Sequence, residues 1–404
     1  MRKPITALRA ECVEGRVELS WYKSTPFMGE AHAPEFASFR ILRREEPGFV
    51  FGSDYAEFFL GLSAQGAVKV YDGPLPASNG RKFRWVDESV QPSRTYCYFV
   101  ATATSPPVGP APVRARDPEV CWSYAALQER LGRLAERYRG LVKLGVCGQS
   151  AGGRDIPRLV VGRRGPALGL VGLIHPGESG PELIVPALEE LLERAPEVFR
   201  NARVVAAPAV SVDGREAMAR GTPWYLRTTA QGVDLNRNFP VDWDQTDLGY
   251  GLDSSDPSSA TWRGPAAGSA AETRAVMEAF RRYPPSVVFS FHCLASVCGL
   301  PALCARRGAG DNRYLAACRR AAETYGRGLF PNLAPAEEWM KPGARAGSLP
   351  AWIHAEFGAP AFDLEGGIGD DERPWATDRT DRACLEQWRR RHARAIEATL
   401  REMG

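Results

Sequence analysis

The chain has 404 residues, of which 44% are hydrophobic and 25% charged, and it carries a formal net charge of +3. These values are ordinary for a soluble globular protein of two or three domains with a sizeable buried core. The nearly balanced charge gives no indication of a nucleic-acid or anionic-membrane partner, and no run of about 18 apolar residues predicts a membrane-spanning helix.

The N-terminus and the cysteines bear on the cellular compartment. Residues 1–11 lack the apolar middle region of a secretory signal, which favours a cytoplasmic location. The nine cysteines are an odd number and contain no Cys-x-x-Cys pair, so they do not describe a disulfide framework. We expect most of them to be small buried hydrophobic residues.

Residues 1–117 predict a small all-β domain. Short segments of alternating apolar and polar residues are separated by Gly, Pro, Asp and Ser, the pattern of half-buried strands joined by turns. The predicted strands are Val17–Trp21, Phe39–Arg43, Val68–Tyr71, Phe83–Trp85 and Tyr96–Thr102. The last strand, with the proline-rich segment Pro106–Pro112 after it, resembles part of a fibronectin type III sandwich. Such modules commonly space or bind, so we expect no catalytic residue here, and the partner of this domain is unknown.

A second domain is predicted for residues 118–404, with the boundary at Asp117-Pro118. Ser123 is a suitable N-cap for a helix in which apolar residues recur at helical spacing up to Tyr138. Beyond this helix, short apolar runs alternate with longer helical patterns such as Glu182–Glu193 and Ala270–Arg281. The short runs are Arg158–Val161, Ala167–Ile174, Val204–Ala207, Ser286–Phe291 and Pro360–Leu364. This alternation is typical of an α/β domain with a mixed, mostly parallel sheet flanked by helices.

The first candidate for chemistry is the segment Ile174-His-Pro-Gly-Glu178. The run Pro166–Ile174 is predicted to be a buried strand, and the Pro-Gly after His175 forces a turn that lets His175 and Glu178 converge on one ion. Histidine and glutamate are ligands of catalytic zinc. Taken alone, the same pair also fits an ordinary strand-end histidine and a solvated glutamate.

Later segments strengthen the metal interpretation. The motif Gly232-Val-Asp-Leu-Asn-Arg-Asn-Phe-Pro240 is followed by a strand that ends at His292 and by another that ends at Glu365. Two imidazoles and one carboxylate leave a fourth zinc position open for water. Open α/β sheets place their sites at the carboxyl ends of strands, so we expect these segments to meet. Cys293 follows His292 directly, but strand alternation points it to the opposite face, which favours packing over ligation.

In this order, the motifs resemble the zinc carboxypeptidase family, the M14 metallopeptidases: a His-x-x-Glu pair, an Asn-Arg pair, a strand-borne histidine and a strand-borne glutamate. The resemblance covers roughly residues 119–404. Ser123–Tyr138 resembles the family's opening helix, Thr261–Pro265 with Glu272-Thr273 resembles the loop before the next helix, and Gly347–Trp352 resembles the specificity loop.

The resemblance implies a metal centre and a base. His175, Glu178 and His292 would hold one Zn²⁺ per chain. Zinc activates water and polarises a carbonyl group, but the attacking water still needs a base to take its proton. Glu365 is the residue that the resemblance assigns to this task.

The resemblance also implies how a substrate is held. Asn236 and Arg237 would bind the free C-terminal carboxylate of a peptide, because a guanidinium group donates two parallel hydrogen bonds to a carboxylate. Arg237 could instead be paired with a structural acid such as Asp234. Arg227 would stabilise the developing oxyanion, with Arg215 and Arg220 as alternatives for this role.

Two departures from the family concern the substrate more than the reaction. The family's pocket tyrosine is expected shortly before Gly347, but residues 331–346 contain no tyrosine and only Trp339 lies nearby. Leu349 and Pro350 stand in the specificity loop without an acid, which argues against a pocket for basic side chains.

The sequence therefore predicts a zinc-dependent metallocarboxypeptidase that hydrolyses C-terminal amino acids from peptides. One alternative is a zinc amidase of cell-wall peptides or acylated amino acids, since related enzymes use the same ligand set. The other is a non-catalytic peptide-binding homologue, for which the missing tyrosine is the only indication.

Overall fold

The computed structural model describes residues 5–23, 36–46, 59, 61–78, 82–221, 226–245, 248–249, 252–292, 301–365 and 382–404. The chain forms two compact units. The first, which we call the β unit, consists of Met1–Cys121 and Ala217–Trp224. The second, the α/β unit, consists of Trp122–Glu216 and Tyr225–Gly404. The boundary proposed from the sequence, at Asp117-Pro118, did not include the second segment of the β unit.

The strands of the β unit pair in an antiparallel manner in the order β1-β2-β5-β4-β3-β6-β7. Their bounds are β1 Ile5–Val13, β2 Arg16–Lys23, β3 Phe36–Glu46, β4 Val68–Ser78, β5 Lys82–Asp87, β6 Thr95–Ala101 and β7 Val108–Arg114. Each predicted strand of this region is present. The structure confirms an antiparallel β domain, and the fibronectin type III resemblance remains a prediction.

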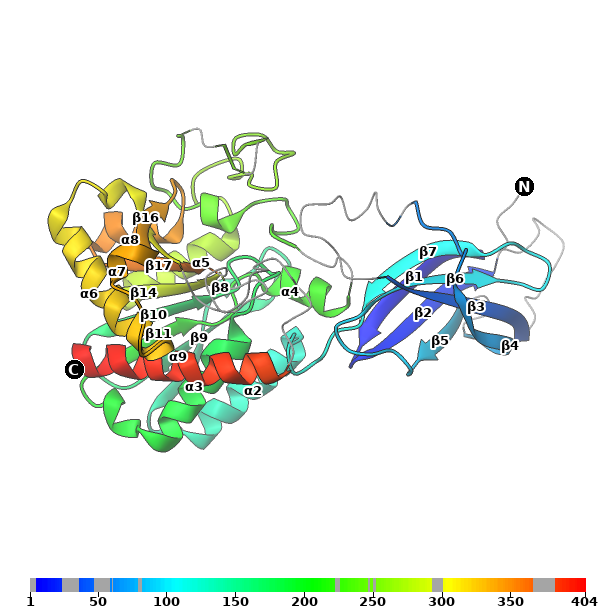
Figure 1. Ribbon diagram of the computed structural model, residues 1–404, viewed down its shortest axis with the longest axis horizontal. Coiled ribbons are helices and arrows are strands. Elements are labelled where there is room, and N and C mark those ends of the chain that lie inside the picture. The colour runs from blue at the N-terminus through cyan, green and yellow to red at the C-terminus, as the bar shows by residue number, and fades with distance from the viewer. Residues whose placement is uncertain are drawn as a thin grey trace. The chain divides into compact units, whose positions relative to one another are not determined.

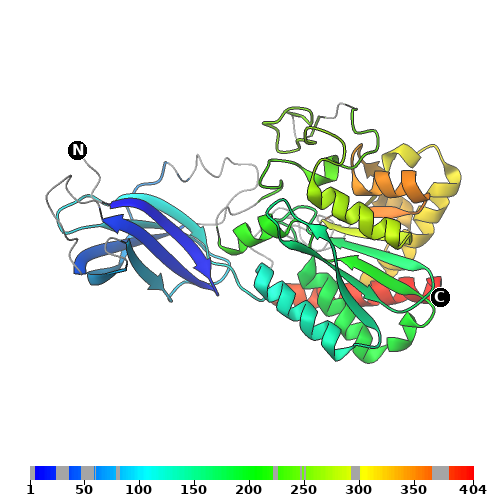
Figure 2. The same cartoon turned by 180° about the vertical axis from the view of Figure 1, so that it is seen from behind.

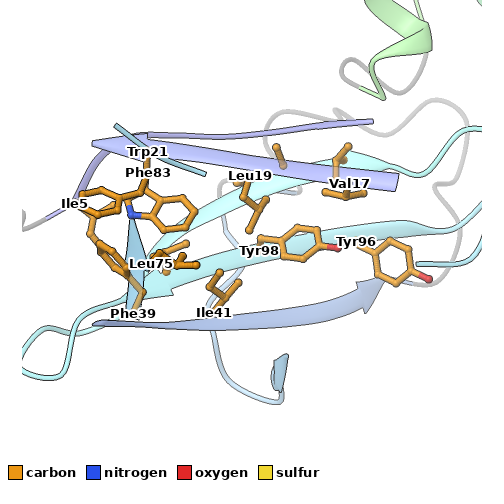
Figure 3. Close-up of a cluster of buried hydrophobic side chains, with 14 of the residues drawn as sticks. Ile5, Val17, Leu19, Trp21, Phe39, Ile41, Leu75, Phe83, Tyr96 and Tyr98 are labelled. Carbon is orange, nitrogen blue, oxygen red and sulfur yellow. The ribbon is translucent and has the colours of Figure 1, made fainter. Parts of the chain in front are cut away.

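Alternation along these strands builds the core of the β unit. Side chains of β2 and β5 face those of β3 and β6, as Figure 3 shows. Trp21 is fully buried, and its ring centroid lies 5.1 Å from that of Phe39 and 6.3 Å from that of Phe83. Burial of such large aromatic side chains is a main source of stability for a domain of this size.

Strands β1 and β7 of the β unit, and its segment Ala217–Trp224, were not predicted. Strand β7 contains Pro110 and Pro112, and proline cannot donate to a sheet. It is tolerated because β7 ends the strand order and pairs only with β6. The segment Ala217–Trp224 was not predicted because its partners are distant in the sequence. The Cys12 amide donates to the Arg220 carbonyl at 2.7 Å, and the Arg114 amide donates to the Gly221 carbonyl at 3.0 Å.

The sheet of the α/β unit has the order β16-β15-β17-β14-β10-β11-β9-β8. Its strands are β8 Val142–Gln149, β9 Asp155–Val161, β10 Ala167–Gly172, β11 Arg203–Ala207, β14 Pro285–His292, β15 Ala302–Ala305, β16 Met340–Ala344 and β17 Ala361–Glu365. The central strands β11, β10, β14 and β17 are parallel, whereas β9 and β15 run antiparallel to their central neighbours. The expected mixed sheet is therefore confirmed. A separate hairpin pairs β12 Leu248–Gly249 with β13 Leu252–Asp253.

Helices cover both faces of this sheet. They are α2 Tyr124–Arg137, α3 Pro181–Arg194, α4 Val212–Ala219, α5 Ala271–Arg282, α6 Asn312–Leu329, α7 Ala336–Trp339, α8 Leu349–Phe357 and α9 Arg382–Met403. Short 3₁₀ turns are η1 Pro196–Phe199, η2 Leu235–Arg237 and η3 Arg306–Gly308. Figures 1 and 2 show α3 and α9 on one side of the sheet and α5 and α8 on the other. Among the described residues, none of the helices combines the length and hydropathy needed to span a membrane.

Local sequence signals account for these elements. Ser123 caps α2 as expected, because its side chain accepts a hydrogen bond from the Ala126 amide at 3.2 Å. The apolar stripe of α2 is buried at Leu127, Leu131 and Leu134. The central strands are apolar on both faces, which is the pattern of parallel strands covered by helices.

Candidate metal centre

The candidate residues lie at one edge of the sheet. His292 is the last residue of β14 and Glu365 the last residue of β17, and His175 follows the end of β10 after two buried residues. Strands β10, β14 and β17 are neighbours and parallel, so their carboxyl ends lie together. The expectation that these segments meet is correct for the described residues.

The turn between His175 and Glu178 is held on both sides. The Glu178 amide donates to the His175 carbonyl at 3.2 Å, and the Gly177 amide donates to the Leu226 carbonyl at 2.9 Å. Gly180 is the N-cap of α3, and a Cβ atom there would collide with the backbone of Gly172 at the end of β10. The glycines at positions 177 and 180 have no side chain, so the backbone can turn tightly on either side of Glu178. This turn brings Glu178 back toward His175.

Three side chains converge on a space for one ion. The Nδ1 atoms of His175 and His292 are 3.2 Å apart, the His175 Nδ1 lies 2.8 Å from Glu178 Oε1, and the His292 Nδ1 lies 3.2 Å from Glu178 Oε2. Bonds of about 2.0–2.1 Å to a tetrahedral zinc place ligand atoms about 3.3 Å apart, so these separations fit. All three residues are buried. The nitrogen and oxygen ligand set suits Zn²⁺.

Neighbouring charges determine the pKa values of Glu178 and His292. Burial alone would raise the pKa of Glu178, but the adjacent His175 and His292 lower it to about 2. Burial would lower the pKa of His292, but Glu178 and Asp363 raise it well above its usual value. Glu178 is therefore an anion at neutral pH, and its buried Oε2 has no hydrogen-bond partner. A cation at the centre would satisfy this oxygen.

Behind each imidazole lies a second carboxylate. Asp234 Oδ1 is 3.0 Å from His175 Nε2, and Asp363 Oδ1 is 3.2 Å from His292 Nε2. Metal-binding histidines commonly donate their other N–H to such a group, which fixes the tautomer and the ring orientation. The sequence analysis did not assign either acid to the centre. Asp363 could have been found, because it precedes Glu365 by two residues on one strand and thus shares its face.

The structure separates the three candidate arginines. Arg227 donates from Nε to Asp234 Oδ2 at 2.9 Å, and its Nη2 is 2.8 Å from the same oxygen. Burial opposes ionisation of Asp234, but Arg227 and His175 hold its pKa far below the usual range. Arg215 is instead buried under the ligand turn, where it donates to the Pro176 and Glu178 carbonyls at 3.2 Å each. Arg220 belongs to the β unit.

Asn236 and Arg237 lie in the turn η2, which Asp234 caps. The Asn236 side chain is buried and used twice within the protein: Nδ2 donates to Asp363 Oδ2 at 2.9 Å, and Oδ1 accepts from the Leu349 amide at 3.0 Å. Arg237 is half-buried and donates from Nη1 to the Asn236 carbonyl at 2.8 Å. Its buried Nε has no hydrogen-bond partner. Arg237 is thus half-buried, while the Asn236 amide is already engaged within the protein.

Glu365 stands opposite His292 in the register of β14 and β17. Residues opposite each other in a sheet project to the same face, so Glu365 lies beside the three candidate ligands. Burial raises the pKa of Glu365 to about 7, despite the opposing effect of His292. A carboxyl group with a pKa near neutrality can accept and return a proton at physiological pH.

Three further predictions concern the surroundings. Gly347–Trp352 leads into α8: Ser348 caps the helix, and Leu349 and Pro350 are buried in its first turn. Trp339, the residue near the expected place of the family's tyrosine, is buried, and its indole donates to the Ala334 carbonyl at 2.9 Å. Cys293 lies outside the described residues.

Comparison with known proteins supports the family resemblance. The family model described as zinc carboxypeptidase matches residues 127–330. This range contains His175, Glu178, Asn236, Arg237 and His292, and Glu365 lies beyond it.

Several solved structures share the fold. Bovine thrombin-activatable fibrinolysis inhibitor, in complex with tick carboxypeptidase inhibitor, matches with a TM-score of 0.58 at 16% identity, covering 70% of this chain and 98% of that chain. Carboxypeptidase A from Helicoverpa armigera matches at 0.53 and 16% identity, covering 90% and 98%. A metallo-carboxypeptidase from Burkholderia cenocepacia matches at 0.50 and 13% identity, covering 96% and 90%. At these identities the likeness establishes the fold and not the substrate.

Proposed function

The chain belongs to the zinc carboxypeptidase family, and on this premise we propose that it is a zinc-dependent hydrolase that removes C-terminal amino acids from peptides. The observation that carries the proposal is the convergence of His175, Glu178 and His292, with Glu365 opposite His292 in the sheet. A ligand set with an adjacent carboxyl group of nearly neutral pKa is suited to metal-assisted hydrolysis.

Each residue has a defined task in the proposed reaction. When bound by His175, Glu178 and His292, zinc supplies Lewis-acid chemistry that polarises the scissile carbonyl and acidifies water. Glu365 takes the proton of the attacking water and delivers it to the leaving amine. Asp234 accepts a hydrogen bond from His175 Nε2, which keeps the Nδ1 lone pair directed toward the metal.

Two arginines bind the charges of the substrate. Arg237 is proposed to hold the terminal carboxylate, since its side chain is half-buried and its guanidinium fork matches a carboxylate. Arg227 is proposed to stabilise the oxyanion that forms as the carbonyl is attacked. Its hydrogen bond to Asp234 holds the guanidinium group near His175, which contacts the same carboxylate.

The test compares one good peptide substrate with a free and with an amidated C-terminus. Amidation should lower kcat/KM of the wild type by an amount that corresponds to about 2–5 kcal/mol, the usual cost of losing a buried charge-assisted contact. Arg237→Ala should remove most of this discrimination. Arg237→Lys is the matched control: it keeps the charge but loses the planar fork, so it should restore only part of the discrimination.

The same comparison tests the carboxypeptidase proposal, and a C-terminal residue of L or D configuration separates it from a cell-wall amidase. If the wild type hydrolyses free and amidated peptides at equal rates, the carboxypeptidase proposal is wrong and an amidase or endopeptidase activity takes its place. Absence of turnover with every substrate of a broad panel, in protein shown to contain zinc, would favour a non-catalytic peptide-binding protein.

A further inference from the structure

A series of polar contacts runs from His292, a proposed zinc ligand, to helix α8. His292 Nε2 lies 3.2 Å from Asp363 Oδ1, and Asp363 Oδ2 accepts from Asn236 Nδ2 at 2.9 Å. Asn236 Oδ1 then accepts from the Leu349 amide at 3.0 Å, in the first turn of α8. His292, Asp363 and Asn236 are all buried. These contacts therefore join three segments that are distant in the sequence, through side chains that are shielded from water.

The sheet register places a block of four polar residues on one face of β14 and β17. Ser290 pairs with Asp363, and His292 pairs with Glu365. The preceding pair, Phe289 and Phe362, faces the other side, where the two rings stack at a centroid distance of 5.3 Å. Alternation thus brings Asp363 to the metal-binding face although the strand is otherwise apolar.

Burying a carboxylate costs several kcal/mol unless hydrogen bonds and opposite charge compensate it. Asp363 Oδ2 accepts a hydrogen bond from the Asn236 amide, and Oδ1, which has no hydrogen-bond partner among the described residues, lies 3.2 Å from His292 Nε2. The imidazole nitrogen also has Ser290 Oγ within 3.0 Å. A carboxylate is the stronger acceptor of the two, so Asp363 is the group expected to hold the Nε2 proton.

We propose that Asp363 is a positioning residue for His292, and that Asn236 ties it to the first turn of α8. By accepting the Nε2 proton, Asp363 keeps the Nδ1 lone pair of His292 directed toward the metal. Asn236 fixes the carboxylate in turn, because its amide donates to Asp363 and accepts from Leu349 in one orientation only. The inference rests on the proposed zinc function, and it gives Asn236 a role within the protein besides the expected contact with substrate.

Each contact between His292 and Leu349 has a fixed donor and acceptor, which suggests a single variant and a double variant as a test. In Asp363→Asn, the side-chain amide of residue 363 faces that of Asn236. In either orientation of these two amides, one of the contacts between His292 and Leu349 is lost. The double variant Asp363→Asn/Asn236→Asp exchanges amide and carboxylate, so each polar contact from His292 to Leu349 can form again. Ser290→Ala is the control, because it removes the other group near the same nitrogen.

The measurements are the zinc dissociation constant, by competition with a chromophoric chelator at fixed pH, and the histidine ¹H–¹⁵N spectrum of the zinc-loaded protein. Asp363→Asn should weaken zinc binding by roughly 10- to 100-fold, the usual effect of losing such a partner. The double variant should recover most of this loss, and Ser290→Ala should change the constant by less than about threefold, because its hydroxyl is the weaker acceptor. The spectrum should show the His292 proton on Nε2 in the wild type.

The outcomes separate this inference from the proposed function. If the wild type binds zinc stoichiometrically and Asp363→Asn binds it equally well, the inference is wrong while the zinc site stands. Equal weakening in the single and double variants, or in Ser290→Ala, would also overturn it. A wild type that binds no zinc would overturn the proposed function as well. Should Asp363→Asn fail to fold, the double variant and the wild-type spectrum still decide.

Discussion

Two glutamates of the centre show how neighbours set the behaviour of a single residue. Glu178 lies between two imidazoles, which lower its pKa to about 2, whereas burial raises the pKa of Glu365 to about 7. The first is a permanent anion suited to bind a cation. The second can exchange a proton near neutral pH, which is the division of tasks that hydrolysis requires.

Replacing Glu365 by glutamine tests the base directly. Glutamine keeps the size of the side chain but cannot accept a proton, so turnover should fall by about two to four orders of magnitude. Zinc content and peptide binding should be retained. Steady-state kinetics, elemental analysis and peptide titration on the same preparations check this expectation, and near-normal turnover would remove Glu365 from the mechanism.

The raised pKa of Glu365 also predicts a pH-dependent stability in the metal-free protein. The folded pKa is about 7 and the ordinary value is 4.5, so the protonated carboxyl contributes stability that is present below pH 4.5 and is lost as pH rises through 7. Metal-free Glu365→Gln should therefore be more stable than the metal-free wild type at pH 8, and the difference should shrink by pH 5. Thermal unfolding in chelator at both pH values measures it. An equal difference at the two values would mean that the ionised carboxylate is not buried.

Among the elements, the start of α8 contacts both Asn236 and the turn that carries Arg237. Gly347 adopts a left-handed conformation with φ of +71°, and a Cβ atom there would collide with the Arg237 carbonyl. Its amide donates to the Val241 carbonyl, and its carbonyl accepts from the Phe239 amide, at 2.9 Å each. The turn that carries Arg237 is therefore packed directly against the turn that begins α8.

Substitution of this glycine should disturb Arg237. Gly347→Ala incurs the left-handed strain of roughly 1–2 kcal/mol and also displaces the Arg237 backbone. Gly358, at the other end of α8, is a matched control: its φ is +65° but no atom lies near its Cβ position. We expect Gly347→Ala to be the less stable variant in urea unfolding, and to raise KM for peptides with a free C-terminus. Gly358→Ala should leave KM unchanged, and equal KM values in both variants would contradict this view of α8.

For the molecule as a whole, all three proposed zinc ligands belong to the α/β unit and come from two of its strand ends. A metal that joins the end of β10 to the end of β14 binds the folded chain only, and so it stabilises the fold by mass action. The β unit contributes no residue to this cluster among the described residues.

Removal of the metal should therefore lower the Tm. Zinc at about 100 times its dissociation constant contributes about 2.7 kcal/mol, which corresponds to roughly 5–10 °C for a unit of this size. Calorimetry with zinc and with chelator measures the shift. His175→Ala should bind little zinc and show almost no difference between the two conditions, and a full shift in this variant would place the metal elsewhere.

Much of this arrangement follows from local patterns in the sequence. Ser123 and the apolar spacing after it specify α2, and apolar runs ending in His292 and Glu365 specify the strands that carry them, because side-chain periodicity is a local property. The order of motifs also identified the family. These inferences needed no knowledge of which segments lie side by side.

The tertiary structure decided the partners. Asp363 meets Asn236 across 127 positions of sequence, Arg227 and not Arg215 reaches Asp234, and the supposed specificity loop leads into a capped helix. No periodicity encodes such pairs, because they depend on the strand order of the sheet and on where each crossover returns. The sequence by itself determined which side chains are available for the chemistry, and the sheet topology decided which buried neighbours orient them and set their charges.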